Sequence, residues 1–410
     1  MRILVLHRIP FQEIRYDRVI DHHVHEVIYV GTRQALADVP AGLRCTRLER
    51  PGRAPTWEEV LVATRGSPRP DRVVSLSEFE LLDAARVREA LDVPGARVAA
   101  VQVVRDKVSM KQAVQARDLR APGFVSCLAV IDGSAGPGGP PWTGKTVLKP
   151  RLGACSRDMV VFDTAGEAVA AVRGGQTGVS AFRAEDFEIE EYVDGPVIHV
   201  DGLLIDGEPF GLVASRYVNT CLDYAQLGAP LGSVELPRSV ELERWAAACA
   251  RAVGIHSGAF HLEGILAPEG PVFLEIGARV GAASVVDVVE LVHGLQLNEA
   301  MLGLEVFGRA DTRAAAHHRR ADGAYGWFVF AGHHLGPGQL RVEGAGRFAD
   351  APHVHRWVQL PDGAPLPDHI TYAPEDAPLS GVVRGSSTDL VERFLRALFD
   401  GVRVRRASAR

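Results

Sequence analysis

Two glutamates in the second half of the chain are spaced so that they could share a cation. Glu263 and Glu275 each lie in an otherwise apolar run, and a turn at Ala267–Gly270 would pair these runs as strands 258–266 and 271–276. Carboxylates held side by side in apolar surroundings repel each other unless they are paired or bind a metal. Hard oxygen ligands in such an arrangement suit Mg²⁺ shared with phosphates. The spacing therefore predicts a magnesium site on a hairpin.

Two further side chains fall close to this hairpin. Arg279 follows Glu275 by four residues in a glycine-containing turn. From there its guanidinium could bind a phosphate or a carboxylate through two hydrogen bonds. A structural salt bridge between Arg279 and the glutamates is the alternative to the metal site. His261 precedes Glu263 by two residues and so shares its strand face. A role of His261 in the site and a role in the core both stay open.

Basic residues that could bind phosphate occur earlier in the chain. Lys107 begins a predicted helix, and Lys149 ends the predicted strand Thr146–Pro150. Lysine offers a compact positive charge for phosphate oxygens. The small-residue loop Gly153–Ser156 follows, and its backbone N–H groups could approach a polyphosphate closely. Taken singly, the lysines are also typical of a solvated surface and the loop of an ordinary turn.

An acidic strand could hold a purine base. The run Phe187–Val193 has strand character and carries Glu190, Glu191, Tyr192 and Val193 at its end. Backbone donors and acceptors at a strand end could pair with an adenine edge, and the acidic side chains could reach its amino group or the ribose hydroxyls. Locally, the pattern favours the alternative, a half-buried strand with a solvated acidic face.

The elements that must position these residues begin with an alternating region. Residues 3–6, 27–30 and 72–76 form short β-rich runs with helical segments between them, which predicts a parallel sheet covered by helices. The turn after the first run, His7–Phe11, contains no glycine. Dinucleotide-binding folds need glycines at this point, so a nicotinamide-dependent oxidoreductase is disfavoured.

Length and composition narrow the class of protein. The 410 residues carry 51 acidic and 45 basic side chains, for a formal net charge of -6, and 47% of them are hydrophobic. These values predict two or three globular domains and disfavour binding to nucleic acid. No apolar run is long enough to cross a membrane. Five scattered cysteines without a metal-binding spacing favour a reducing cytoplasm. A homodimer is expected only because dimers are common among enzymes.

The order of these motifs resembles the ATP-grasp superfamily, most closely the ATP-dependent carboxylate–amine ligases that include L-amino-acid ligases. The resemblance covers roughly residues 100 to 310, and it is carried by the segments Asp106–Lys107, Val147–Pro150, Gly153–Ser156, Glu190–Gly195, His261–Glu263 and Glu275–Arg279. It implies an α/β and α+β fold with three parts. These are an N-terminal parallel α/β domain (1–103), an ATP-grasp domain (104–310, divided near 195) and a C-terminal lid or appended subdomain (311–410).

The resemblance also implies a role for each motif. ATP would be the nucleotide, with Mg²⁺ or alternatively Mn²⁺ bound by Glu263 and Glu275. The phosphate and adenine contacts would come from Lys107, Lys149, the loop from Gly153 to Ser156, and the strand residues Glu190, Glu191, Tyr192 and Val193. Arg279 would steady an acyl-phosphate, His261 would line the site, and Arg216 stands where such enzymes often have a basic phosphate contact.

This chain departs from the family pattern at two positions. Val197 stands where an acidic residue often contacts the ribose, and Glu191 or Asp201 would have to replace it. Gly277 stands where many members carry an asparagine that binds the metal.

The implied activity is an ATP-dependent ligase that joins a small carboxylate, such as an amino acid, to an amine. Alternatives are an ATP-grasp carboxylase, a phosphotransferase, and a non-catalytic nucleotide-binding module.

Overall fold

The computed structural model describes residues 1–136, 139–318 and 322–407. The N-terminal part is a parallel sheet in the order β3–β2–β1–β4, as the alternating pattern predicted. Its strands are β1 (Arg2–Leu6), β2 (Glu26–Gly31), β3 (Thr46–Glu49) and β4 (Arg72–Val74). The helices of this part are α1 (Phe11–Ile14), α2 (Tyr16–Val19), α3 (Arg33–Leu36), α4 (Thr56–Ala63), α5 (Leu81–Ala90) and α6 (Val98–Val103), with a 3₁₀ turn η1 at Glu78–Glu80. Ile3 and Val5 face one apolar core and Leu4 and Leu6 another, so both faces of the sheet are covered.

A small antiparallel sheet follows, in the order β5–β8–β6–β7. Its strands are β5 (Phe124–Ser126), β6 (Thr146–Pro150), β7 (Val160–Phe162) and β8 (Phe187–Glu191). Helices α8 (Cys127–Asp132) and α9 (Ala165–Gly174) pack on one face around Leu148 and Ile189. Because strand side chains alternate between faces, Lys149, Glu188 and Glu190 point the other way. Helix α7 (Lys107–Gln115), capped by the Asp106 carboxylate, lies on that side.

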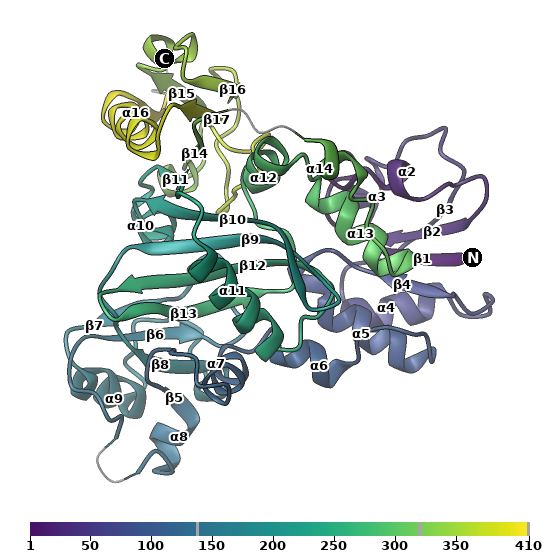
Figure 1. Cartoon of the computed structure of the whole chain (residues 1–410). Coiled ribbons are helices and arrows are strands. Elements are labelled where there is room, and N and C mark those ends of the chain that lie inside the picture. The colour runs from purple at the N-terminus through teal and green to yellow at the C-terminus, as the bar shows by residue number, and fades with distance from the viewer. Residues whose placement is uncertain (137–138, 319–321, 408–410) are drawn as a thin grey trace.

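A large antiparallel sheet forms the centre of the molecule, in the order β13–β12–β9–β10–β11–β14–β17–β16 (Figure 1). Its strands are β9 (Val197–Ile205), β10 (Glu208–Val218), β11 (Leu231–Glu235), β12 (Gly258–Ala267), β13 (Gly270–Gly277), β14 (Ala324–Phe330), β16 (Val354–Gln359) and β17 (Leu379–Gly385). Three of these strands come from the segment 311–410, so that segment continues the central sheet.

Helices cover both faces of the central sheet. Helix α11 (Val240–Ala252) packs through Trp245 beneath β9 and β12, and α12 (Val285–His293) and α13 (Leu297–Phe307) pack on the opposite face. The remaining elements are α10 (Cys221–Leu227), α14 (Arg313–His317), α15 (Gly346–Ala349), α16 (Thr388–Gly401), η2 (Ala184–Asp186), η3 (His333–Leu335) and the pair β15 (Leu340–Glu343) and β18 (Arg403–Arg406).

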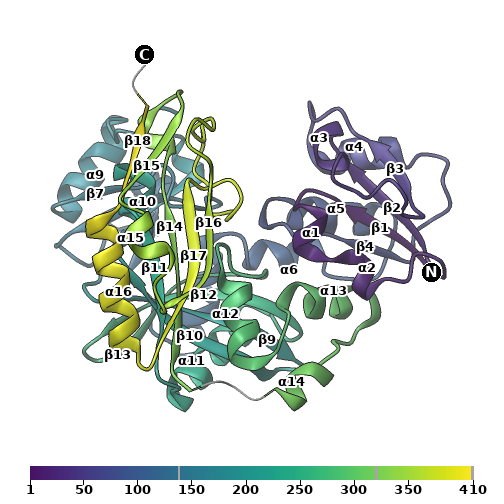
Figure 2. The same cartoon turned by 90° about the horizontal axis from the view of Figure 1, so that it is seen from above.

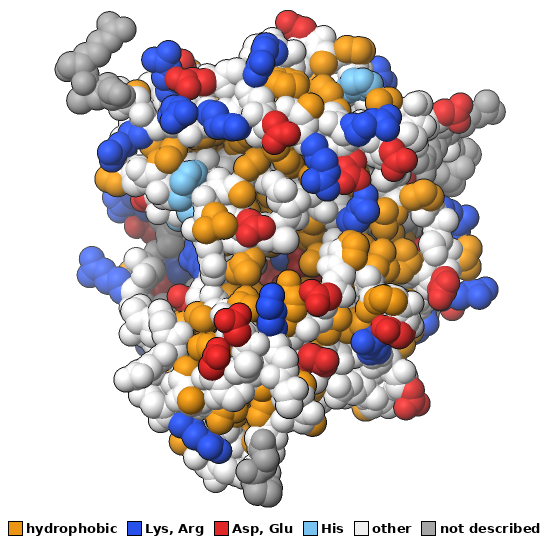
Figure 3. Space-filling model, turned by 90° about the vertical axis from the view of Figure 1, so that its left-hand side faces the viewer, with side chains coloured by type: hydrophobic (Ala, Val, Ile, Leu, Met, Phe, Trp, Pro, Cys, Tyr) orange, Lys and Arg blue, Asp and Glu red, His pale blue; other side chains and the backbone are white. Residues whose placement is uncertain are grey.

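Figure 2 shows the N-terminal parallel sheet on one side of the molecule and α16 with its neighbouring strands on the other. Lys, Arg, Asp and Glu side chains are interspersed over the face seen in Figure 3. Among the residues that the structure describes, no helix combines the length and the apolar character needed to cross a bilayer. The boundaries predicted for the three parts stay predictions.

Candidate active site

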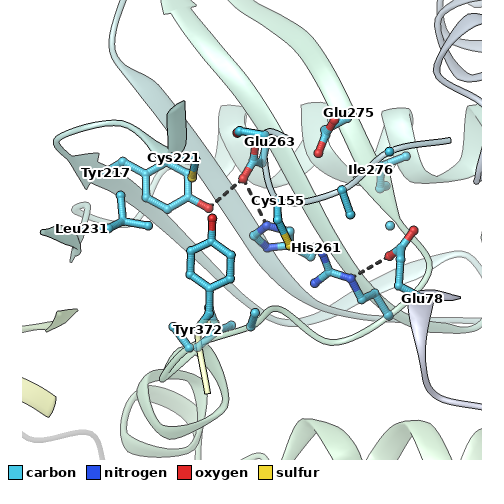
Figure 4. Close-up of a pocket in the computed structure, with 18 of the residues that line it drawn as sticks. Glu78, Cys155, Tyr217, Cys221, Leu231, His261, Glu263, Glu275, Ile276 and Tyr372 are labelled. Atoms are coloured by element: carbon cyan, nitrogen blue, oxygen red, sulfur yellow. Dashed lines mark hydrogen bonds and ion pairs between the residues drawn. The ribbon is translucent and has the colours of Figure 1, made fainter. Parts of the chain in front are cut away.

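The two predicted metal-binding glutamates lie opposite each other on a hairpin. Strands β12 and β13 pair with Glu263 facing Glu275, and the hairpin closes from Ala267 to Gly270. Gly270 adopts a φ of 121°, a value that glycine accommodates best. Both carboxylates line one pocket (Figure 4). The predicted hairpin is therefore confirmed, and a register shift between Glu263 and Gly264 brings the two glutamates directly opposite each other.

Glu275 is held by lysine. Its Oε2 lies 3.2 Å from Lys107 Nζ at the first turn of α7. Burial alone would raise the pKa of Glu275, but Lys107 and Lys149 outweigh that effect and lower it to about 2. The carboxylate is thus ionised at neutral pH and available to a cation.

Glu263 is held by two aromatic side chains instead. The Tyr217 hydroxyl donates to Glu263 Oε1 over 2.7 Å, and His261 Nε2 lies 3.4 Å from the same oxygen. Both contacts involve Oε1, so Oε2 has no hydrogen-bond partner among the described residues. One oxygen is positioned and the other is left for a ligand.

His261 belongs to a buried chain of hydrogen bonds. Asp201 receives His261 Nδ1 on one oxygen at 2.7 Å and His199 Nδ1 on the other at 2.5 Å, and His199 Nε2 contacts Ser233 Oγ at 2.7 Å. Burial lowers the pKa of His261, but the Asp201 carboxylate raises it more, to about 9. His261 therefore carries a positive charge at neutral pH and presents it beside Glu263.

This chain of hydrogen bonds removes one sequence-based alternative. Asp201 is only 1% exposed and both of its oxygens are taken by imidazoles. It is not free to replace the ribose contact missing at Val197. The hydrogen-bonded residues come from His-x-Asp on β9 and His-x-Glu on β12. The sequence does not show that these two short motifs lie opposite each other, because this depends on the pairing of β9 with β12.

A second cluster joins the predicted lysine to the small sheet. Lys149 Nζ lies 2.6 Å from Glu190 Oε1, and Lys111 Nζ lies 2.6 Å from Glu190 and 2.7 Å from Glu188. Burial lowers the pKa of Lys149, but Glu190, Glu188 and Glu275 outweigh it and raise the value to about 12. Lys149 and Glu190 also line a second pocket, which they share with Lys107, Glu263 and Glu275.

Lys111 was missed by the sequence reasoning. The sequence feature that could have identified it is its spacing from Lys107, since residues four apart lie on one face of a helix. The face of α7 that carries Lys107 to the pocket thereby carries Lys111 to Glu188 and Glu190.

The small-residue loop is brought to the carboxylates as expected. Gly153 and Ser156 line both pockets, and Lys107 Nζ donates to the Gly153 carbonyl over 2.7 Å. Ser156 has a φ of 51° and Cys155 a φ of 61°, which is uncommon for residues with side chains. Gly153, Ser156 and the two lysines thus surround the same space as the glutamates.

Three of the four predicted adenine-binding residues lie outside both pockets. Glu191, Tyr192 and Val193 line neither of the two pockets. The Glu191 carboxylate accepts the Gly123 N–H at 3.1 Å, and the Tyr192 N–H donates to the Lys145 carbonyl. Their contact with a base stays a prediction.

Of the two arginines predicted for the site, the structure places only Arg279 in the pocket. Arg279 lines the pocket, where its Nε donates to Glu78 Oε2 over 2.6 Å. Arg216 does not reach the pocket, because its neighbour Tyr217 occupies the face of β10 that looks into it. Arg216 instead pairs with Glu392 of α16 on the opposite face. The prediction that Arg216 contacts phosphate is therefore not supported by its position.

Apolar and aromatic groups close the other end of the pocket. They are Tyr217, Cys221, Leu231, Val285, Trp327 and Tyr372. In Figure 4, Tyr372 points its hydroxyl toward Tyr217 and Glu263. The pocket thus combines a charged wall, which could hold phosphate and carboxylate groups, with an apolar wall that could receive an uncharged side chain.

Comparisons with known proteins establish the fold. No protein-family model matches the chain. The carnosine synthase 1 of Gallus gallus is 35% identical over 109 residues, a segment that makes up 26% of this chain and 12% of that protein.

Solved structures match the chain over nearly its full length. An L-amino acid ligase from Bacillus licheniformis superposes with a TM-score of 0.71 at 20% identity, covering 99% of this chain and 98% of the ligase. A phosphoribosylglycinamide synthetase from Anaerococcus prevotii gives 0.66 at 12% identity, covering 99% of each chain. An N5-carboxyaminoimidazole ribonucleotide synthetase from Thermus thermophilus gives 0.61 at 16%, covering 98% of each.

Proposed function

We propose that this chain, whose ATP-grasp fold the solved structures confirm, is an ATP-dependent ligase that joins a carboxylate to an amine. Its substrates would be amino acids or another small carboxylate, with ADP and phosphate as the other products. The observation that carries the proposal is the pairing of Glu263 with Glu275 across β12 and β13, in a pocket that also holds Lys107 and Arg279. The likeness to an L-amino acid ligase along nearly the whole chain supports the same class of reaction.

The donor set fits a magnesium ion. Glu275 is ionised and Glu263 has one oxygen free of contacts with the described residues, so two hard oxygen ligands face one space. These two residues would hold the ion, and it would neutralise charge on the phosphates of ATP. Gly277 supplies no side-chain ligand, so water or substrate oxygens would complete the coordination.

The chain's own residues would bind and orient the phosphates. Lys107 and Lys149 both bring positive charge close to Glu275, and the loop from Gly153 to Ser156 lines the same pocket with small residues. The last residues of β8 and the two that follow it, Glu190–Val193, would hold adenine through their backbone. Catalysis of this kind depends mainly on positioning and on neutralising charge.

The reaction would proceed in two transfers. An oxygen of the substrate carboxylate attacks the terminal phosphorus of ATP, and ADP leaves. The amine then attacks the acyl carbon of the resulting acyl-phosphate, and phosphate leaves. The positive charges of Arg279 and His261 lie in the wall of the pocket, where they would stabilise the negative acyl-phosphate.

The test is a product assay with the full chain and Mg·ATP. Pools of amino acids and small carboxylic acids are screened for release of ADP and phosphate, and products are identified by mass spectrometry. We expect release that needs both a carboxylate and an amine, with a new mass equal to their sum less water. A phosphate ester or a carboxylated product would identify a phosphotransferase or a carboxylase instead. ATP binding without turnover in any pool would contradict the proposal.

A further inference from the structure

A glutamate of the N-terminal part reaches into the pocket of the ATP-grasp domain. Glu78 begins the 3₁₀ turn η1 that follows β4, about two hundred residues before the metal-site hairpin in sequence. Its side chain is 10% exposed and lines the pocket beside Ile276 (Figure 4). No motif marks Glu78 in the sequence, and only the folded chain brings it to the site.

Glu78 is placed between two arginines. Its Oε2 accepts from Arg279 Nε at 2.6 Å, and its Oε1 pairs with Arg105, just before α7. Arg279 Nη1 donates to the Val280 carbonyl over 2.9 Å. These two bonds fix the plane of the Arg279 guanidinium, and its Nη2 has no hydrogen-bond partner among the described residues. One carboxylate between two guanidinium groups leaves a net positive charge at this wall of the pocket.

Gly277 makes room for this contact. A Cβ at position 277 would lie 2.7 Å from Glu78 Oε2 and 3.2 Å from Arg279 Cγ. Gly277 is not among the glycines with a positive φ, so its backbone conformation does not demand glycine. A Cβ at position 277 would therefore displace the Glu78 carboxylate and leave the backbone unstrained.

We propose that Glu78 is a positioning residue, which holds Arg279 in the orientation needed to bind the negative group formed from the substrate carboxylate. This inference rests on the proposed ligase function. Gly277 permits the arrangement, and a side chain at 277 would push the Glu78 carboxylate away from Arg279. The N-terminal part thus contributes directly to the geometry of the active site.

A double-mutant cycle tests the proposal. Glu78→Ala, Gly277→Ala and the double variant are compared with the wild type in the ligase assay, and Glu58→Ala, an exposed glutamate on α4, is the matched control. ATP affinity and thermal unfolding are measured for each protein. We expect each single variant to lose about tenfold to a hundredfold in kcat, since small misplacements of catalytic groups cost that much, with an ATP affinity close to wild type.

The double variant separates positioning from general damage. If both changes act through the Glu78–Arg279 contact, the double variant will lose no more kcat than the worse single variant. Losses that multiply, or a Glu78→Ala enzyme with wild-type kcat, would overturn the proposal. Glu78→Gln keeps an acceptor oxygen for Arg279 and should recover part of the loss, which a folding defect would not explain. A wild-type protein that forms no amide would instead refute the ligase function itself.

Discussion

Glu263 and Glu275 face each other across β12 and β13, yet they are held by chemically different partners. The Lys107 ammonium pairs with Glu275, whereas the Tyr217 hydroxyl and the His261 imidazole hold one oxygen of Glu263. The two carboxylates are therefore not interchangeable. Glu275 is linked through Lys107 of α7 to the loop Gly153–Ser156, while Glu263 is linked through His261 to the buried hydrogen bonds of the central sheet.

Glu275→Gln should abolish magnesium-dependent turnover. The change removes the negative charge of one oxygen ligand of the proposed magnesium site. It also removes the carboxylate that pairs with Lys107, whose side chain is only 8% exposed. We expect ADP release to fall by at least about a hundredfold while circular dichroism stays native. Glu269→Gln, in the exposed turn of the same hairpin, is the control and should keep wild-type rates. Normal turnover of Glu275→Gln would remove the metal assignment.

Lys149 and Arg216 should differ in their effect on ATP affinity. Lys149 lines the pocket next to Glu275, whereas Arg216 lies on the other face of the sheet with Glu392. We expect Lys149→Ala to weaken ATP binding about tenfold or more by isothermal titration, and Arg216→Gln to change it by less than about threefold. Equal effects of the two changes would show that the pocket does not hold the phosphates.

Lys111→Met should destabilise the small sheet strongly. Lys111 is fully buried and lies between two carboxylates, so its loss leaves Glu188 and Glu190 with less compensation. Removing one partner from a buried ion pair typically costs about 3–5 kcal/mol of the free energy of unfolding. Urea denaturation measures the loss, and Lys145→Met, an exposed lysine just before β6, should cost less than about 1 kcal/mol. A loss below about 1 kcal/mol for Lys111→Met would contradict this account.

Glu59 should make the N-terminal part sensitive to acid. Burial raises the pKa of its carboxyl, but three backbone N–H donors, from Gly52, Arg53 and Ala54, together with Arg50, lower it from 4.5 to about 2. A carboxyl whose pKa is lower in the folded than in the unfolded protein stabilises the folded state at pH values above the unfolded-state pKa. For Glu59 this stabilisation is lost as the pH falls from about 4.5 towards 2.

Glu59→Gln should therefore be less stable than wild type at pH 7, by about 2 kcal/mol, because hydrogen bonds to a charged group are lost. Urea denaturation at pH 7 and pH 3 should show this difference shrinking at the lower pH. The neighbouring exposed Glu58→Gln should show no such trend. A difference that stays constant between the two pH values would show that the charge of Glu59 is not responsible.

The hairpin was predictable because a two-residue connection between two apolar runs is a local signal, and it brings Glu263 and Glu275 close together. Their exact pairing was not, because it depends on a register shift between Glu263 and Gly264 that the spacing in sequence does not reveal. The position of Lys149 at the end of a strand was also predictable, because its strand is short and ends in proline. The parallel N-terminal sheet followed from the alternation of strands and helices.

Arg216 and Glu78 show where such local reasoning fails. Side chains alternate between the two faces of a strand, so a shift of one residue moves Arg216 from one face to the other. Strand β10 carries an irregularity between Phe210 and Val213 that no sequence pattern revealed. Glu78 meets Arg279 across about two hundred residues, and this contact depends on how the N-terminal part packs against the hairpin. Contacts of this kind are set by tertiary packing, which short-range spacing does not encode.

The central sheet runs without interruption from the metal-site strand β13 to β16, and this continuity bears on how the protein could be divided. Strand β11 pairs with β14, and the segment beyond residue 310 also supplies Trp327 and Tyr372 to the pocket. A fragment that stops at residue 310 would leave the edge of β11 unpaired, which is a template for intermolecular strand addition. We expect such a fragment to aggregate, and the carboxy-terminal hundred residues to be exchangeable between relatives only together with the strands they extend.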